Sequence, residues 1–261
     1  MLHTRHITAP LLFAALTAAP LAAQDAFNWR GRVDNGRTLE IKSINGSIHA
    51  VAANGTEIRV NATKQARRSN PDEVRIEVVE HDGGVTICAV YPTPRNRSPN
   101  ECRPGNAGRM NSSDNDVTVD FSVEVPAGVR LAATTVNGAV RATSLGADVR
   151  AVTVNGDITV STGGTARATT VNGEIDVSMA RSDWTGDLEF ETVNGGIAIA
   201  LGDNVSADVE ASTVNGSIET DFPLTVRGRF GPKRVTGTIG QGGRKLALNT
   251  VNGSIRIRKL N

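Results

Sequence analysis

The chain has 261 residues, a formal net charge of +1, 39% hydrophobic residues and only 3% aromatic residues. This length fits one large domain or two smaller ones, and a core so poor in aromatic residues must be built from Val, Ile, Ala, Leu and Thr. The balanced charge argues against general nucleic-acid binding, which depends on a strongly basic surface.

The first 23 residues have the pattern of a secretory signal peptide. Arg5 precedes an apolar stretch at 9–19, and Leu21-Ala22-Ala23 resembles the small-residue cleavage site of such signals. No later stretch approaches the roughly 20 apolar residues of a membrane helix. We therefore expect an exported protein, periplasmic, cell-surface or secreted, with no transmembrane segment in the mature chain.

Residues 24–130 are expected to form an N-terminal strand-rich cap. Residues 74–91 are typical of a hairpin that turns at Asp82-Gly83-Gly84, and residues 117–126 alternate apolar and polar side chains. Between them, residues 92–115 are rich in Pro, Asn, Arg, Ser and Gly, which predicts an exposed, partly disordered loop. Arrays of repeats generally need such atypical terminal units.

The two cysteines, Cys88 and Cys102, are predicted to form a disulfide that closes this loop, because disulfides are the usual state of paired cysteines in exported proteins. Neither a CxxC spacing nor a neighbouring His supports a catalytic role for them.

A four-residue motif, Thr-Val-Asn-Gly, recurs through residues 131–261. It occupies 135–138, 153–156, 170–173, 192–195, 213–216 and 250–253, and a relative, Ser-Ile-Asn-Gly, occupies 43–46. The last two copies are 37 residues apart, about twice the usual interval, and VTGTIG at 235–240 divides this gap, with Thr236-Gly237 in place of Asn-Gly. Repetition at this short period predicts one β-solenoid coil per motif.

Each unit places the motif between two short strands with alternating apolar residues. This alternation predicts that Val154, Ile158 and Val160 point inward, as do Val171, Ile175 and Val177 in the next unit. A single hairpin of this size is marginal in water, and stacking would supply the missing hydrogen bonds and burial. The sequence thus predicts an all-β, single-chain parallel β-solenoid (β-helix) with an N-terminal strand-rich cap, the cap and the repeats at 131–261 forming one continuous domain.

The Asn-Gly pairs are interpreted as structural corners and not as ligand-binding groups. Gly adopts positive φ without a Cβ penalty, Asn tolerates it best among the other residues, and stacked asparagines can form a hydrogen-bonded ladder. The predicted corner residues are Asn137, Gly138, Asn155, Gly156, Asn172, Gly173, Asn194, Gly195, Asn215, Gly216, Asn252 and Gly253.

The stretch VDFSVEVPAGVRLAATTVNGAVRATSLGADVRAVTVNGDITVSTGG resembles the bacterial putative adhesin family of β-strand-repeat proteins, a domain of unknown function. The similarity includes the strand ending Val125-Pro126-Ala127-Gly128 and the recurrent Asn-Gly units, and extends from about Leu39 to Ile257. It implies an adhesin-like β-solenoid on an exported protein, with a non-catalytic role and no catalytic residues to assign.

A polysaccharide-acting enzyme is the alternative hypothesis. Asp157 and Glu174 would lie on neighbouring coils about 4.8 Å apart, with Asp176 beside them, and close carboxylates can act as an acid/base pair. The more ordinary interpretation is that these three acids are solvated outward residues. Trp184, in the insertion that lengthens one repeat, is the aromatic candidate, either as a lid over the stack or as a sugar platform.

Charge is unevenly distributed along the chain. Residues 110–222 contain 17 acidic and 5 basic residues, whereas residues 223–261 contain 9 basic and no acidic residues. This pattern fits either a solvated surface with a protected last strand or a dipolar rod that meets an anionic polymer or another copy. The expected partners are a cell-envelope polymer, a glycan or a protein, with self-association as an option. No metal or other cofactor is expected, because no Cys/His ligand spacing or calcium loop is present.

Overall fold

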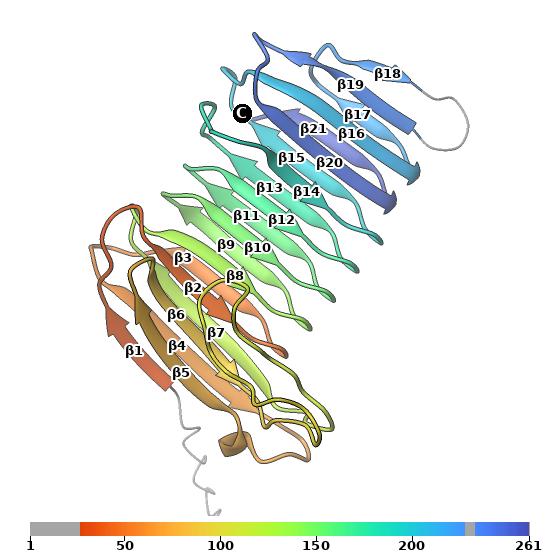
Figure 1. Ribbon diagram of the computed structural model, residues 1–261. Helices are drawn as coiled ribbons and strands as arrows, with labels where there is room; N and C mark the ends of the chain where they lie inside the picture. The colour runs from red at the N-terminus through yellow and green to blue at the C-terminus, as the bar shows by residue number, and fades with distance from the viewer. Residues whose placement is uncertain (1–26, 228–232, 261) are drawn as a thin grey trace, which may run out of the picture.

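The computed structural model describes residues 27–227 and 233–260, which form two facing β-sheets (Figure 1). The signal peptide predicted at 1–23 lies outside the described residues. Sheet A contains, in spatial order, β1 (Phe27–Gly31), β4 (Ile58–Gln65), β7 (Thr118–Val125), β3 (Ile48–Ala52), β9 (Val140–Leu145), β11 (Ile158–Thr162), β13 (Ile175–Met179), β15 (Ile197–Leu201), β21 (Ile255–Lys259) and β17 (Ile218–Thr220).

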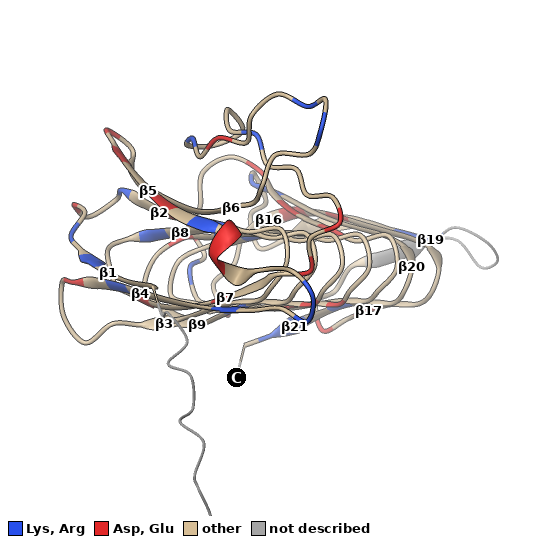
Figure 2. Ribbon diagram, turned by 90° about the horizontal axis from the view of Figure 1, so that it is seen from below, with Lys and Arg blue, Asp and Glu red and all other residues tan. Residues whose placement is uncertain are grey.

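Sheet B contains, in spatial order, β18 (Thr225–Arg227), β19 (Lys233–Ile239), β16 (Ala207–Asn215), β20 (Lys245–Asn252), β14 (Leu188–Glu191), β12 (Ala166–Thr169), β10 (Val149–Val152), β8 (Arg130–Thr134), β2 (Thr38–Lys42), β6 (Gly84–Val90) and β5 (Arg75–His81). Figure 2 shows the two sheets as separate layers. Within the described ranges the only helical element is a 3₁₀ turn at Pro71–Glu73, and no helix there is long and apolar enough to span a membrane.

The predicted β-solenoid is confirmed, and it has two strands per coil. Each coil contributes one strand to sheet B and, after the Asn-Gly corner, one strand to sheet A, and strands of successive coils pair in parallel and in register. The aliphatic residues two positions after the corner glycines therefore form one buried row, which comprises Ile48, Val140, Ile158, Ile175, Ile197, Ile255 and Ile218. Antiparallel strands occur only toward the two ends of the array, within the part of the chain that is described.

The corner motif places its threonine in the core and its valine at the surface. Thr153 and Thr170 are 2% exposed, whereas Val154 and Val171 are 36% and 38% exposed. The predicted inward position of these two valines is therefore wrong, although Ile158, Val160, Ile175 and Val177 are buried as expected. The inward position of the motif is thus the threonine and not the valine. A polar threonine is tolerated inside the stack because its hydroxyl donates a hydrogen bond to an acceptor there.

That acceptor is the carbonyl of the corner glycine in the neighbouring coil. Thr153 Oγ1 donates to Gly138 O at 2.9 Å, and Thr170 Oγ1 donates to Gly156 O at 3.0 Å. The same bond recurs at four further corners, from Thr135 to Gly46, Thr192 to Gly173, Thr250 to Gly195 and Thr213 to Gly253, at 2.8–3.0 Å.

Close approach between coils, more than positive φ, requires glycine at the corner. Among the corner glycines only Gly46 (φ 117°) and Gly195 (φ 159°) have φ in the left-handed region, so the predicted reason fails at the others. A Cβ on Gly173 would overlap the carbonyl of Gly156, with its carbon only 2.5 Å away. The corner glycines thus pack backbone against backbone along the stack, and any side chain would separate the coils.

The asparagines form a continuous hydrogen-bonded ladder on the outer edge of the stack. Asn155 Nδ2 donates to Asn137 Oδ1, and Asn172 Nδ2 donates to Asn155 Oδ1, each at 2.8 Å. In spatial order the ladder contains Asn45, Asn137, Asn155, Asn172, Asn194, Asn252 and Asn215.

The spatial order of the coils differs from their order in the sequence at both ends. The β2–β3 coil, which the sequence groups with the cap, lies inside the stack between β6–β7 and β8–β9. The β20–β21 coil lies between β14–β15 and β16–β17, although it comes last in the chain. Two sequence interpretations are therefore wrong: Thr236-Gly237 lies within strand β19 and makes no corner, and the basic strand β21 is an interior strand with no exposed edge.

The segment between β6 and β7 has a defined structure where the sequence suggested partial disorder. Cys88 and Cys102 form a disulfide with a Cα–Cα distance of 5.7 Å. Lys42 Nζ donates to Arg103 O at 2.6 Å, and Asn100 Nδ2 donates to Asn111 O at 2.7 Å. These backbone-directed bonds hold the loop over sheet B.

Candidate functional site

The outward acids of β13 lie on the exposed face of sheet A. Strand register aligns Asp157 with Glu174 on adjacent coils, as expected, and Asp157 Oδ1 accepts a 2.9 Å hydrogen bond from the Glu174 backbone N–H. Asp176 pairs with Thr159 and Ala198. The structure therefore brings Glu174 and Asp176 into one shallow depression, whereas Asp157 does not line it.

This depression crosses three strands and has oppositely charged walls. Glu174, just before β13, and Asp176 on β13 form one wall, and Arg256 and Arg258 on β21 form the other. Between them, Gly196, just before β15, and Ala198 on β15 are small residues that form the floor. The walls are two strand spacings apart, roughly 10 Å, and the depression has a volume of about 260 Å³. We call it the sheet A trough.

The arginine wall comes from β21, the last described strand, and Arg256 follows Asp176 by 80 residues in the sequence. Arg256 is placed opposite Asp176 because the β20–β21 coil inserts next to β15. Arg256 Nε also lies 3.5 Å from Glu219 Oε2 on β17. No sequence pattern predicts this arrangement, because it depends on the out-of-order stacking of the last coil.

Trp184 is a core residue and cannot serve as a surface candidate. It is 3% exposed and belongs to the main hydrophobic core. Its backbone carbonyl accepts a 2.7 Å bond from Arg244 Nε, and its indole N–H has no hydrogen-bond partner. The sugar-platform interpretation is therefore wrong, because almost none of the ring is accessible to a ligand.

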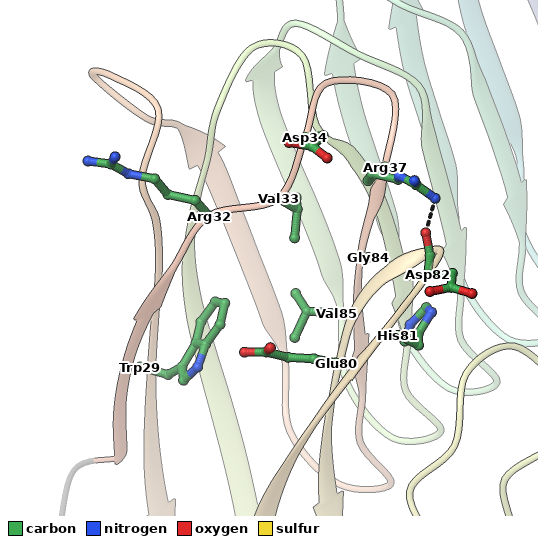
Figure 3. Close-up of a pocket in the computed structure, with 10 residues that line it drawn as sticks. All are labelled: Trp29, Arg32, Val33, Asp34, Arg37, Glu80, His81, Asp82, Gly84 and Val85. Carbon is green, nitrogen blue, oxygen red and sulfur yellow. Dashed lines mark hydrogen bonds between the residues drawn. The ribbon is translucent and has the colours of Figure 1, made fainter.

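A second pocket lies at the N-terminal end of the stack, between the outermost strands of the two sheets (Figure 3). Trp29 comes from β1, the last strand of sheet A, and Glu80 comes from β5, the last strand of sheet B. Val33 and Val85 contribute apolar surface. The remaining lining residues are Arg32, Asp34, Arg37, His81, Asp82 and Gly84. This end pocket has a volume of about 260 Å³.

Two side chains of the end pocket are fixed by hydrogen bonds. Arg37 Nη1 donates to the backbone carbonyl of Asp82 (Figure 3). His81 Nδ1 accepts from the Gly83 N–H at 3.1 Å, so Nε2 carries the proton and donates to Thr86 Oγ1 at 3.1 Å. The predicted turn at Asp82-Gly83-Gly84 is present and forms one rim of this pocket.

Sequence reasoning missed the end pocket. Trp29 precedes the first repeat and belongs to no motif, and its neighbours in space come from a hairpin about 50 residues away. Within the described ranges, no group of three or more His, Cys, Asp or Glu side chains is arranged to hold a metal ion.

Comparison with known proteins gives a family for the chain. The family model described as Toastrack DUF4097 matches residues 32–258. The chain belongs to the Toastrack DUF4097 family. As the sequence resemblance implied, the family is an adhesin-like domain of unknown function.

Two solved structures are similar to this chain at low identity. A putative cell adhesion protein from Clostridium sporogenes has 11% identity and a TM-score of 0.43, over 90% of this chain and 100% of that one. A putative adhesin from Bacteroides fragilis has 10% identity and a TM-score of 0.37, over 91% of this chain and 98% of that one. No match is found among curated proteins.

Proposed function

We propose that this Toastrack protein is a non-catalytic, exported, adhesin-like module that binds a cell-envelope polymer, glycan or protein. Residues 1–23 serve as its signal peptide, and the cap at 24–130 and the repeats at 131–261 act as one domain. The sheet A trough carries the proposal. It combines two walls of opposite charge, of which only Arg256 has an ion-pair partner among the described residues, Glu219, with a floor of small side chains that leaves room for a bound chain.

The arrangement of the acids supports binding over hydrolysis. Asp157 uses one carboxylate oxygen to hold the backbone of Glu174, and it lies outside the trough. Glu174 and Asp176 face arginines across an open surface, whereas glycoside hydrolysis requires two carboxyl groups on opposite sides of the scissile bond. The polysaccharide-acting enzyme that uses Asp157, Glu174 and Asp176 is therefore not favoured.

Binding to envelope fractions tests the proposal. Purified protein would be incubated with bacterial envelope preparations, and the bound fraction would be measured at low and high salt. The double variants Glu174→Gln/Asp176→Asn and Arg256→Gln/Arg258→Gln should each lower the bound fraction several-fold, and salt should weaken binding because the contacts are exposed charges. Arg141→Gln, on the same face but outside the trough, is the matched control.

Unchanged binding by both double variants would show that the trough is not the contact surface. Absence of binding to every envelope fraction would contradict the proposed function itself. Release of soluble sugar or peptide during the incubation would restore the enzyme alternative.

A further inference from the structure

The end pocket is the place where the described chain offers an accessible tryptophan. The sequence contains two tryptophans, and Trp184 is buried in the core. Trp29 is half-buried, with its indole folded back over Gly31, where a Cβ would overlap the ring. Figure 3 shows the ring standing at one side of the pocket. An aromatic ring held at the rim of a cavity offers a rigid apolar surface for a ligand.

The polar groups of the end pocket are free to meet a ligand. In the described part of the chain, no hydrogen bond or ion pair engages the side chains of Arg32, Asp34 or Glu80. Figure 3 shows the Glu80 carboxylate directed toward the indole of Trp29. Glu80 thus provides a carboxylate acceptor beside an apolar platform, a combination of apolar surface and a placed polar group that is usual in small-molecule sites.

Size and charge restrict the ligand further. The volume of about 260 Å³ lies just below the common range of about 300–1,000 Å³ for ligand pockets, so a single ring fits better than a long segment. Three carboxylates and two guanidinium groups line the pocket, and the Arg37 guanidinium already donates to the backbone carbonyl of Asp82. A ligand rich in hydrogen-bond donors is therefore preferred over an anionic one.

We infer that the end pocket binds a neutral or amino-substituted saccharide ring. The apolar face of the sugar packs on Trp29, and its hydroxyl or ammonium groups donate to the Glu80 carboxylate beside the ring (Figure 3). This inference goes beyond the proposed function, because it assigns a ligand class to a second site that is separate from the sheet A trough.

Titration with sugars tests the assignment. The wild-type protein and the Trp184→Phe variant, in which Trp29 is the only tryptophan, would be titrated with glucose, N-acetylglucosamine, glucosamine and glucuronate. Trp29 emission should shift with at least one of the first three sugars and less with glucuronate. Calorimetry should show a loss of affinity of about tenfold for Trp29→Ala, as expected for a lost aromatic contact.

Glu80→Gln is the second variant because Glu80 has no intramolecular partner whose loss could unfold the protein. It should weaken binding of the same sugar by a similar factor of about ten, the loss of a hydrogen bond to a charged group. Asp203→Asn, at an exposed acid in the connection between β15 and β16 at the other end of the stack, is the control and should bind as the wild type does.

The inference is overturned if none of the four sugars binds the wild-type protein at 10 mM, roughly a hundred times a 0.1 mM Kd. It is equally overturned if Trp29→Ala and Glu80→Gln both bind normally, or if glucuronate binds most tightly. The sugar titrations use the purified protein alone, without envelope fractions, so their outcome does not depend on envelope binding. Envelope binding that survives Glu80→Gln but not the trough variants would therefore remove the saccharide assignment and leave the proposed function intact.

Discussion

The hydroxyl of Thr170 and the carbonyl of Gly156 form a 3.0 Å hydrogen bond between neighbouring coils. The same carbonyl faces the Cα of Gly173 so closely that no Cβ could be added there. This one backbone oxygen thus explains two residues of the repeated motif, the threonine and the glycine. Threonine is required to satisfy the oxygen, and glycine is required to let the next coil approach it.

Replacing Thr170 by Val should destabilise the protein by about 1–3 kcal/mol. The two side chains have nearly the same shape, but Val leaves the partly buried Gly156 carbonyl without its hydrogen-bond donor. Urea unfolding followed by circular dichroism measures the change. Thr159→Val, on the exposed face of β11, is the control and should alter stability by less than about 0.5 kcal/mol.

Replacing Gly173 by Ala should cost about 1–3 kcal/mol, because the added methyl group forces two backbones apart. Gly163 provides a matched control, since a Cβ there would meet its nearest atoms at 3.6 Å, an ordinary contact. Thermal melts of Gly173→Ala and Gly163→Ala should differ by several degrees. Equal melting temperatures would mean that the corner can relax around a side chain.

The disulfide should hold the loop between β6 and β7 on sheet B. Mass spectrometry of alkylated, unreduced protein should find Cys88 joined to Cys102 and no alkylated thiol. The chain between them has a sequence separation of 14, so reduction should lower stability by about 3 kcal/mol in the chain-entropy model. Two freely alkylated cysteines would contradict the pairing.

Asp116 should make one loop contact sensitive to acid. Its carboxylate accepts hydrogen bonds from the backbone N–H groups of Ser69 and Arg68, and the bonds to Ser69 contribute most to lowering its pKa from 3.8 to about 2. Because the folded pKa is lowered, the stabilisation is present above about pH 4 and is lost as pH falls through about 2.

The melting temperatures of the wild type and Asp116→Asn should therefore differ most above pH 4, and the difference should shrink toward pH 2. Asp203→Asn, an exposed acid, is the control and should track the wild type. A difference between Asp116→Asn and the wild type that stays constant from pH 7 to pH 2 would exclude Asp116 as the titrating group.

The architecture could be predicted from the sequence because the repeat is periodic, and so could the acidic wall of the sheet A trough, whereas the arginine wall and the end pocket could not. Asn137, Asn155 and Asn172 recur at nearly constant spacing and indicate stacked coils. Alternation of apolar residues predicts that Val154 points inward, whereas its side chain lies at the surface. The pattern alone does not reveal that the hydroxyl of the preceding threonine has an acceptor inside the stack. Arg256 and Trp29 lie in their sites through contacts between segments that are distant in the chain, and no local pattern encodes such contacts.

The interior position of the β20–β21 coil has a consequence for how the chain is assembled. During synthesis, residues 245–259 emerge after both of the coils that flank them, so β14–β15 and β16–β17 cannot complete their pairing until this late segment arrives. The stack cannot simply grow one coil at a time toward its C-terminal end. Shortening the chain from residue 260 would therefore remove a middle layer and leave two unpaired edges, and we expect truncation to split the array instead of trimming it.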